Sequence, residues 1–189
     1  MKFIILLLST VVLAMGCSSA PVPVEKEKPT ELNIEQLPMR QYSRNLADQL
    51  FASAVNVKAG QQVAVTSLTW LDSNLNRSPL VALQLQEELA SELHSMSLNV
   101  LEFKLTDGIR VTPNGDFALS RNYLELAELQ AADYILTGTL VERNEGLVVN
   151  LRLIDFNSRV LRATAQTLIP NSVVRTLRDD AGIEIVGAR

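Results

Sequence analysis

The chain has 189 residues, of which 47% are hydrophobic and 20% are charged, and its formal net charge is −4 with an isoelectric point near 5.1. This acidic balance supplies no basic surface for nucleic acid or for anionic lipid, so neither is expected as an electrostatic partner. With one histidine and one cysteine, the sequence argues against a metal site built from His and Cys ligands and against a Ser-His or Cys-His triad.

The first 16 residues have the pattern of a secretion signal. Lys2 supplies a positive charge, a short and almost wholly apolar run follows, and the small Gly16 precedes Cys17. The apolar run is too short to span a bilayer comfortably. Cys17 after Gly16 resembles a bacterial lipobox, although Ala14 stands three places before the cysteine, where leucine is usual.

We therefore expect cleavage after Gly16 and attachment of a diacylglyceride, with chains such as palmitate, to the thiol of Cys17. Each buried methylene contributes about 0.8 kcal/mol, so two or three acyl chains anchor a protein firmly. A secreted protein with an unmodified Cys17 is the alternative. Ser18 replaces the aspartate that usually retains lipoproteins at the inner membrane, which favours the outer membrane, on its periplasmic side.

Three segments are expected after the signal. Residues 17–38 comprise the lipidated cysteine and an extended tether, because their prolines and their alternating Glu-Lys run cannot build a packed core. Residues 39–170 are expected to form one folded domain, and residues 171–189 a C-terminal tail. Within the tail, 173–177 is a candidate helical turn and 183–186 a candidate edge strand.

The domain is predicted to begin with a helix and a strand. Ser43 is the expected N-cap of a helix over residues 44–58, in which apolar side chains recur at helical spacing. Residues 61–69 are nearly continuous in strand-forming residues, as in a strand buried on both faces. The polar loop 70–77 resembles a calcium loop in part, but Arg77 stands where glycine is needed, so no calcium site is expected.

A second helix is expected over residues 78–97, with Ser78 as its N-cap and proline in its first turn. Its glutamates, Glu92 among them, are assigned to a solvated face rather than to an acid/base pair, and His94 to the surface near the C-terminus. The predicted apolar stripe of this second helix consists of Ala82, Leu85, Leu89, Leu93 and Met96. A strand over residues 99–104 is expected after the helix.

The middle of the chain is predicted to be a loop and a third helix. Residues 106–117 form the loop, in which Pro-Asn-Gly-Asp at positions 113–116 is a tight-turn signature. Ser120 is the expected N-cap of a helix over residues 121–131, with Leu124 among its inward-facing side chains.

The last third changes to a period of two residues. A strand is predicted over residues 133–141, where Gly138 indicates a close backbone approach. Alternating segments over 147–154 and 161–167 follow, joined by turns of hairpin length. The predicted order, α-β-α-β-α-β-β-β, gives an α/β (α+β) fold with a single mixed sheet and helices packed on it.

Several stretches carry a family resemblance. The most specific is Arg110–Arg121, Arg-Val-Thr-Pro-Asn-Gly-Asp-Phe-Ala-Leu-Ser-Arg, and the others lie within residues 63–67, 85–93, 100–103, 134–139 and 149–154. Together they resemble the FlgO family, the outer-membrane flagellar lipoproteins of sheathed polar flagella. The order of strands is similar, more loosely, to periplasmic domains of the curli secretion lipoprotein CsgG, of TolB at its amino terminus, and of the penicillin-binding-protein activator LpoB.

The resemblance implies a non-enzymatic outer-membrane lipoprotein that assembles or stabilises flagellar basal-body rings and is needed for motility. Its implied partners are other ring or outer-membrane proteins and copies of itself, with no cofactor, metal or small-molecule substrate. The alternative is an envelope lipoprotein that regulates a peptidoglycan synthase or belongs to a secretion complex. A periplasmic enzyme using carboxylates such as Glu102 and Asp116 is a third hypothesis, which no motif supports.

Arg110, Asp116 and Arg121 are the candidate partner contacts. The two arginines flank the most specific stretch, where they either contact a neighbouring subunit or form ion pairs that hold the loop. Trp70 and Tyr134 are expected to pack at the edge of the core rather than to form a ligand platform.

Overall fold

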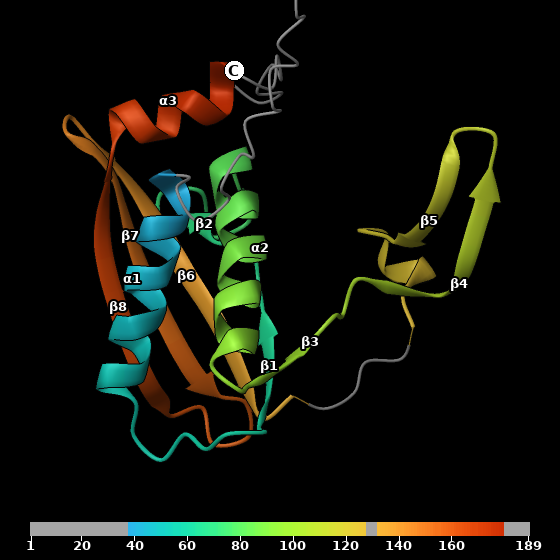
Figure 1. Cartoon of the computed structure of the whole chain (residues 1–189), viewed down its shortest axis with the longest axis horizontal. Helices are drawn as coiled ribbons and strands as arrows, with labels where there is room; N and C mark the ends of the chain where they lie inside the picture. The colour runs from blue at the N-terminus through green and yellow to red at the C-terminus, as the bar shows by residue number, and fades with distance from the viewer. Residues whose placement is uncertain (1–37, 128–131, 180–189) are drawn as a thin grey trace, which may run out of the picture. The chain divides into compact units, whose positions relative to one another are not determined.

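A computed structural model of the chain describes residues 38–127 and 132–179 (Figure 1). All of these belong to one unit, Asn33–Arg189. The signal, Cys17, the tether as far as residue 37 and the edge strand predicted at 183–186 lie outside the described residues. In chain order the elements are α1 (Pro38–Ser53), β1 (Gln62–Val65), β2 (Thr69–Trp70), α2 (Leu80–Ser95), β3 (Asn99–Leu101), β4 (Leu105–Thr112), β5 (Gly115–Leu119), the 3₁₀ turn η2 (Tyr123–Glu125), β6 (Tyr134–Arg143), β7 (Gly146–Asp155), β8 (Leu161–Pro170) and α3 (Asn171–Asp179).

The main sheet has six strands and mixes parallel with antiparallel pairs. Its order is β3-β1-β6-β7-β8, and β2 pairs with β6 beside this path. β1 runs parallel to β3 and β6, whereas β6, β7 and β8 are successive antiparallel neighbours. The predicted mixed sheet with helices is confirmed, and β4 and β5 add a separate two-stranded sheet.

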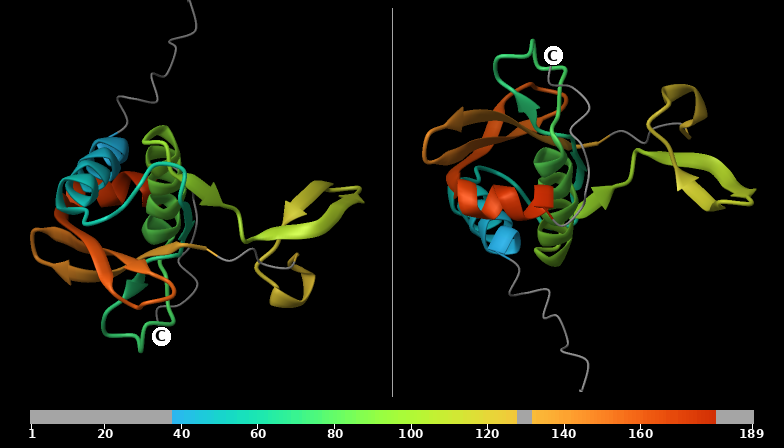
Figure 2. Two further views of the ribbon diagram at one scale, coloured as in Figure 1. Left: turned by 90° about the horizontal axis from the view of Figure 1, so that it is seen from below. Right: turned by 90° about the horizontal axis from the view of Figure 1, so that it is seen from above.

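The core lies between this sheet and the helices. Both views in Figure 2 show α1 and α2 on the same face of the sheet. From Tyr134 to Leu140 in β6 and from Leu147 to Leu153 in β7, every second residue is buried on that side, because strand side chains alternate between faces. Burying one such leucine or valine contributes roughly 1.5–3 kcal/mol. The most completely buried side chains include Leu46, Leu85, Leu89, Leu136, Leu140, Val149, Leu151 and Ile169.

The first helix begins earlier than predicted. It starts at Pro38, which suits a first turn because proline has no N–H to leave unsatisfied, and its buried stripe opens with Met39. The N-cap prediction for Ser43 is therefore wrong. Ser43 is fully buried inside α1, and its Oγ lies 2.9 Å from Oε2 of Glu88 on α2.

The second helix is confirmed, with two corrections. Its N-cap is Pro79 rather than Ser78, and no side chain caps it. Glu92 is not on a solvated face: it is only 3% exposed, and its two oxygens lie 3.2 Å from Arg40 and 3.4 Å from Arg44. The reason is that α1 packs on this side of α2 and brings both arginines to it. His94 is exposed, as predicted.

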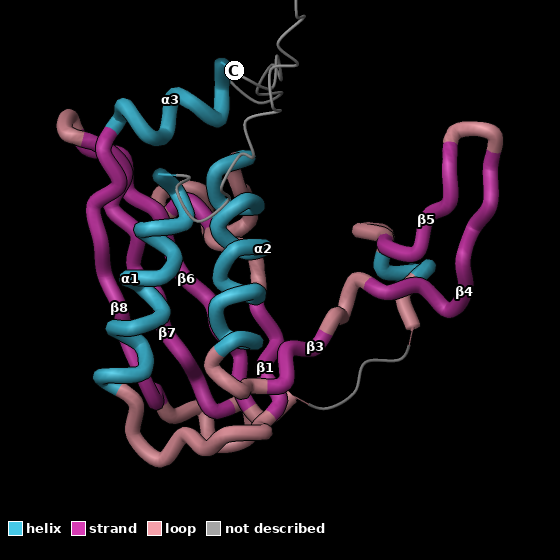
Figure 3. The backbone as a smooth tube through the Cα atoms, viewed as in Figure 1, coloured by secondary structure: helices cyan, strands magenta, loops and turns pink. Residues whose placement is uncertain are grey.

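The predicted loop and third helix are wrong. Residues 106–117 lie mostly in β4 and β5, which form an antiparallel hairpin around the predicted tight turn. Residues 121–127 contain only η2, so Figure 3 shows a single short helical turn there. Asn122 caps η2 by accepting a hydrogen bond from Leu124 N at 3.3 Å. Leu124 is 76% exposed rather than inward-facing, and residues 128–131 lie outside the described part.

The C-terminal strands follow the prediction. A Cβ added at Gly138 would collide with the backbone oxygen of Asn150 on β7, which confirms the predicted close approach. β8 is an outer strand, and α1 covers its free edge: the Ser53 hydroxyl accepts from Thr164 N at 3.0 Å, and Gln49 Oε1 accepts from Gln166 N at 3.1 Å. Such cover protects an edge strand from pairing with another chain.

Candidate functional site

The candidate site is the hairpin segment, which we define as residues 105–125 with β4, β5 and η2. Arg110 is paired with Phe117 across the hairpin and Val111 with Asp116, and the register shifts between Leu105 and Arg110. At the base of the segment, Ala127 N donates to Leu105 O at 3.0 Å.

The hairpin segment concentrates exposed apolar side chains. In the part of the chain that the structure describes, fourteen large hydrophobic residues are exposed, and seven of them belong to this segment. Exposed apolar groups gathered in this way are typical of surfaces that contact another macromolecule. The seven are Leu105, Ile109, Val111, Phe117, Leu119, Tyr123 and Leu124.

The apolar side chains occupy both faces of the hairpin. By strand alternation and the observed register, Val111 lies on one face, whereas Phe117 and Leu119 share the opposite one. Ile109 is 71% and Val111 75% exposed. A two-stranded hairpin has no interior and is at best marginally stable by itself. Both faces therefore have apolar surface available to a partner.

Arg110 joins the strands to η2. Its guanidinium lies 5.6 Å from the ring centroid of Phe117, within cation–π range, and 3.6 Å from Oε2 of Glu125. Glu125 also accepts hydrogen bonds from Ser120 Oγ at 2.8 Å and Asn122 Nδ2 at 3.3 Å. These two bonds, with a smaller contribution from Arg110, lower the pKa of Glu125. One carboxylate thus connects β4, the end of β5 and η2.

The other two candidate contacts from the sequence also lie in the hairpin segment. Asp116, which is paired with Val111 across the hairpin, is exposed, and so is Arg121, which lies between β5 and η2. Neither forms an ion pair with another residue in the described ranges. Glu102 accepts a bond from the nearby Lys104 N at 3.0 Å. The apolar residues and Glu125 were missed from the sequence, although Ile109 and Val111 alternate in β4 and Phe117 and Leu119 alternate in β5.

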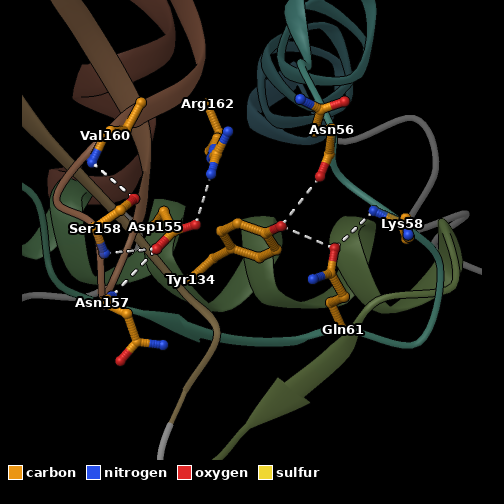
Figure 4. Close-up of polar contacts among 9 residues, drawn as sticks. All are labelled: Asn56, Lys58, Gln61, Tyr134, Asp155, Asn157, Ser158, Val160 and Arg162. Atoms are coloured by element: carbon orange, nitrogen blue, oxygen red, sulfur yellow. Dashed lines mark hydrogen bonds and ion pairs between the residues drawn. The ribbon is translucent and has the colours of Figure 1, made fainter.

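A second polar cluster, at one end of the main sheet, has a structural role (Figure 4). Asp155 accepts bonds from Ser158 N at 2.9 Å, Asn157 N at 3.2 Å and Arg162 at 2.9 Å. The Ser158 backbone bond and the Arg162 bond lower the pKa of Asp155 to about 2. With its oxygens engaged by one turn and by β8, this carboxylate holds the β7–β8 connection.

Tyr134 and Trp70 pack as predicted. Tyr134 is 3% exposed, and its hydroxyl lies 2.8 Å from Gln61 Oε1 and 3.3 Å from Asn56 O, which joins β6 to the chain before β1 (Figure 4). Trp70 is partly buried against the core. Both rings therefore belong to the packing of the sheet.

Across residues 38–127 and 132–179, no three His, Cys, Asp or Glu side chains gather closely enough to hold a metal ion. In the same residues no helix has both the length and the apolar content needed to cross a membrane.

Comparison with known proteins identifies one family. The FlgO protein family model matches residues 44–174, a range that contains the whole hairpin segment. No curated protein matches the chain. Solved structures with related folds include the LpoB C-terminal domain from Escherichia coli, with 14% identity and a TM-score of 0.44 over 69% of this chain and 98% of that chain.

Two other solved structures are similar at the same level. The NMR structure of E. coli LpoB has 14% identity and a TM-score of 0.46 over 86% of this chain and 84% of that chain. The PelC dodecamer from Paraburkholderia phytofirmans has 15% identity and a TM-score of 0.36 over 63% of this chain and 78% of that chain. At such identities and scores these likenesses carry no functional argument.

Proposed function

The chain belongs to the FlgO protein family, and from this premise we propose that it is a non-enzymatic outer-membrane lipoprotein that assembles or stabilises flagellar basal-body rings and is needed for motility. Membership of the family indicates a protein of the cell envelope. The observation that carries the proposal is the hairpin segment, because the family match includes it and it exposes apolar side chains on both faces.

The membrane attachment in this proposal is a lipid on Cys17. Its support is the signal pattern of residues 1–16 and the small residue before the cysteine. Several acyl chains on one cysteine hold a protein at a membrane without a spanning segment. Residues 17–38 then serve as the tether between the lipid and the folded domain, on the periplasmic side of the outer membrane.

The contact with ring proteins in this proposal is made by the hairpin segment. Phe117 and Tyr123 supply aromatic side chains, which dominate binding energy at many interfaces. Arg110, Asp116 and Arg121 surround them with charge of both signs, and charged rims govern register and partner choice more than affinity. The partner is therefore a protein with an apolar surface and polar edges.

Lipoprotein variants and electron cryotomography test the attachment. Basal bodies are imaged in cells that lack the protein and in cells that carry Cys17→Ser. We expect outer-membrane ring density and swimming to be lost in both. Ser18→Asp is expected to retain the lipoprotein at the inner membrane with the same loss, and Ser18→Ala is the matched control that keeps both.

Two results would contradict the proposal in different ways. Loss in the deletion alone would retain the flagellar role but exclude the anchor as a requirement. Intact rings and normal swimming in all strains would exclude the flagellar role. Altered cell-wall synthesis in those strains would then favour regulation of a peptidoglycan synthase.

A further inference from the structure

A groove of about 230 Å³ opens where α2 begins, beside α3 and the turn between β6 and β7. Figure 1 shows α3 crossing this end of the sheet. Glu142 and Arg175 are exposed polar residues that border the groove. Its apolar lining consists of Trp70, Leu80, Val81, Leu147, Val174 and Leu177.

The position of α3 is fixed at its first residue and along its inner side. Asn171 N donates to Glu145 O at 3.3 Å, and Asn171 Nδ2 donates to Asn144 O at 2.9 Å. Val174 and Leu177 pack against the core. Because Leu177 lines the groove and α3 ends at Asp179, the chain leaves this helix two residues beyond a groove-lining side chain.

We propose that residues 180–189 of the chain itself occupy this groove. Ile183 and Ile185 are separated by one residue, so in an extended conformation both side chains point the same way and can enter a groove lined by Trp70, Leu80 and Val81.

The charges of the segment and the groove are complementary. The side chains of the segment, which include Asp180, Glu184 and Arg189, carry a net charge of −1, and the groove carries Arg175 and the positive end of the α2 dipole, where no side chain caps the helix. A carboxylate is stabilised at such a helix start, and more so beside a guanidinium. Glu142 is the single acidic side chain that lines the groove, and Arg175 offsets its charge, so the positive end of the α2 dipole leaves the lining with a net positive character.

Covalent connection makes weak binding sufficient. A segment joined to its site by a short linker has an effective concentration of about a millimolar or more. An intrinsic dissociation constant near that value therefore still gives substantial occupancy. Three to five residues separate Asp179 from the two isoleucines, and Gly182 within them permits a reversal of direction.

The test uses Trp70, the only tryptophan of the chain, as a fluorescent reporter in the groove. The full chain in phospholipid vesicles is compared with Ile183→Ser/Ile185→Ser and with the matched control Ala181→Ser/Ala188→Ser. We expect the isoleucine variant to shift Trp70 emission to longer wavelength and to increase its quenching by acrylamide. The control is expected to match the unmodified chain.

A peptide of residues 180–189 supplies the second measurement. Added to the isoleucine variant at up to about millimolar concentration, it is expected to restore the original emission, whereas a scrambled peptide is not. Leu80→Ser provides a double-mutant cycle from the groove side, in which its effect on quenching is expected to shrink when the isoleucines are already replaced. Far-UV circular dichroism checks that each variant is folded.

Unchanged Trp70 emission and quenching in the folded isoleucine variant would overturn the proposal. So would additive effects of Leu80→Ser and the isoleucine replacements, because independent sites do not couple. These readouts do not depend on flagella, so their failure is distinguishable from failure of the proposed function.

Discussion

The main sheet and the hairpin segment use the same kinds of side chain in opposite ways. Val149 and Leu151 of β7 are at most 1% exposed, whereas Ile109 and Val111 of β4 are more than 70% exposed. α1 and α2 cover the first pair, and β4 pairs with β5 in a sheet of two strands. Apolar strand residues stabilise the fold where a second layer covers them, and they are available for binding where none does.

The largest expected effect sharpens this comparison directly. Leu151→Ala is expected to lower the free energy of unfolding by about 2–5 kcal/mol, because it leaves a cavity between sheet and helices. Val111→Ala is expected to change it by less than about 0.5 kcal/mol, since the side chain is already in water. Denaturant unfolding of both variants measures the difference. Equal losses would mean that the hairpin side chains are buried in the folded protein.

The ion cluster between α1 and α2 gives the next effect. Glu92→Ala leaves Arg40 partly buried without its carboxylate, and we expect the free energy of unfolding to fall by about 1–3 kcal/mol. The loss is smaller than for a fully buried ion pair, because water reaches the half-exposed Arg44. Glu87→Ala on the same helix is the control: its side chain is 64% exposed, and the expected change is below about 0.5 kcal/mol. Equal decreases in the melting temperatures of the two variants would contradict the structural role of Glu92.

A smaller effect depends on pH. The pKa of Asp155 falls from 3.8 to about 2 in the folded protein, so its contribution to stability is present above pH 3.8 and is lost as the pH falls towards 2. Asp155→Asn lacks this contribution. We therefore expect its melting temperature to fall less steeply than that of the unmodified chain between pH 4 and pH 2. Parallel curves through that window would show that the Asp155 bonds do not persist in solution.

The smallest expected effect on overall stability is in the hairpin segment. Arg110→Met removes the contact to Phe117 and the ion pair to Glu125. We expect the melting temperature to stay unchanged and amide hydrogen exchange in β4 and β5 to become faster, because these contacts are local. Leu75→Met, outside the segment, is the control for a change at an exposed position. A lower melting temperature of Arg110→Met would mean that the hairpin is part of the main cooperative unit.

The same contrast explains which elements the sequence could predict. β6, β7 and β8 were predicted because one face of each strand is buried and the other is more exposed to water. Apolar and polar residues therefore alternate with a period of two along the sequence. α2 was predicted from a clear apolar stripe, in which Leu85, Leu89 and Leu93 are buried. Burial by a second layer is what produces a periodic signal.

The hairpin has only a short form of that signal, two alternating apolar residues in each strand, because no layer buries either face. Its apolar residues are distributed over both faces, so β4 resembled a loop. The third helix was predicted from a Ser120 cap and helical spacing, but Ser120 Oγ instead donates to Glu125 at 2.8 Å and Asn122 caps a 3₁₀ turn. Short polar side chains compete with helix formation in this way.

The burial of polar side chains between α1 and α2 also could not be predicted from the sequence. Glu92 and Ser43 lie on faces that only the packing of α1 against α2 encloses. Their partners are about 45 residues away along the chain, which local spacing does not reveal. At the candidate site, the sequence singled out Arg110, Asp116 and Arg121 within the hairpin segment, but not the exposed apolar residues beside them.

The most direct test of the central claim is swimming and ring density in cells that carry Val111→Ser/Phe117→Ser. Leu71→Ser/Leu75→Ser is the control, because it replaces exposed apolar residues outside the hairpin segment. With equal protein levels and equal melting temperatures, we expect the hairpin variant to lose swimming and outer-membrane ring density, and the control to keep both. Normal rings and swimming in the hairpin variant would contradict the role of this segment as the docking surface.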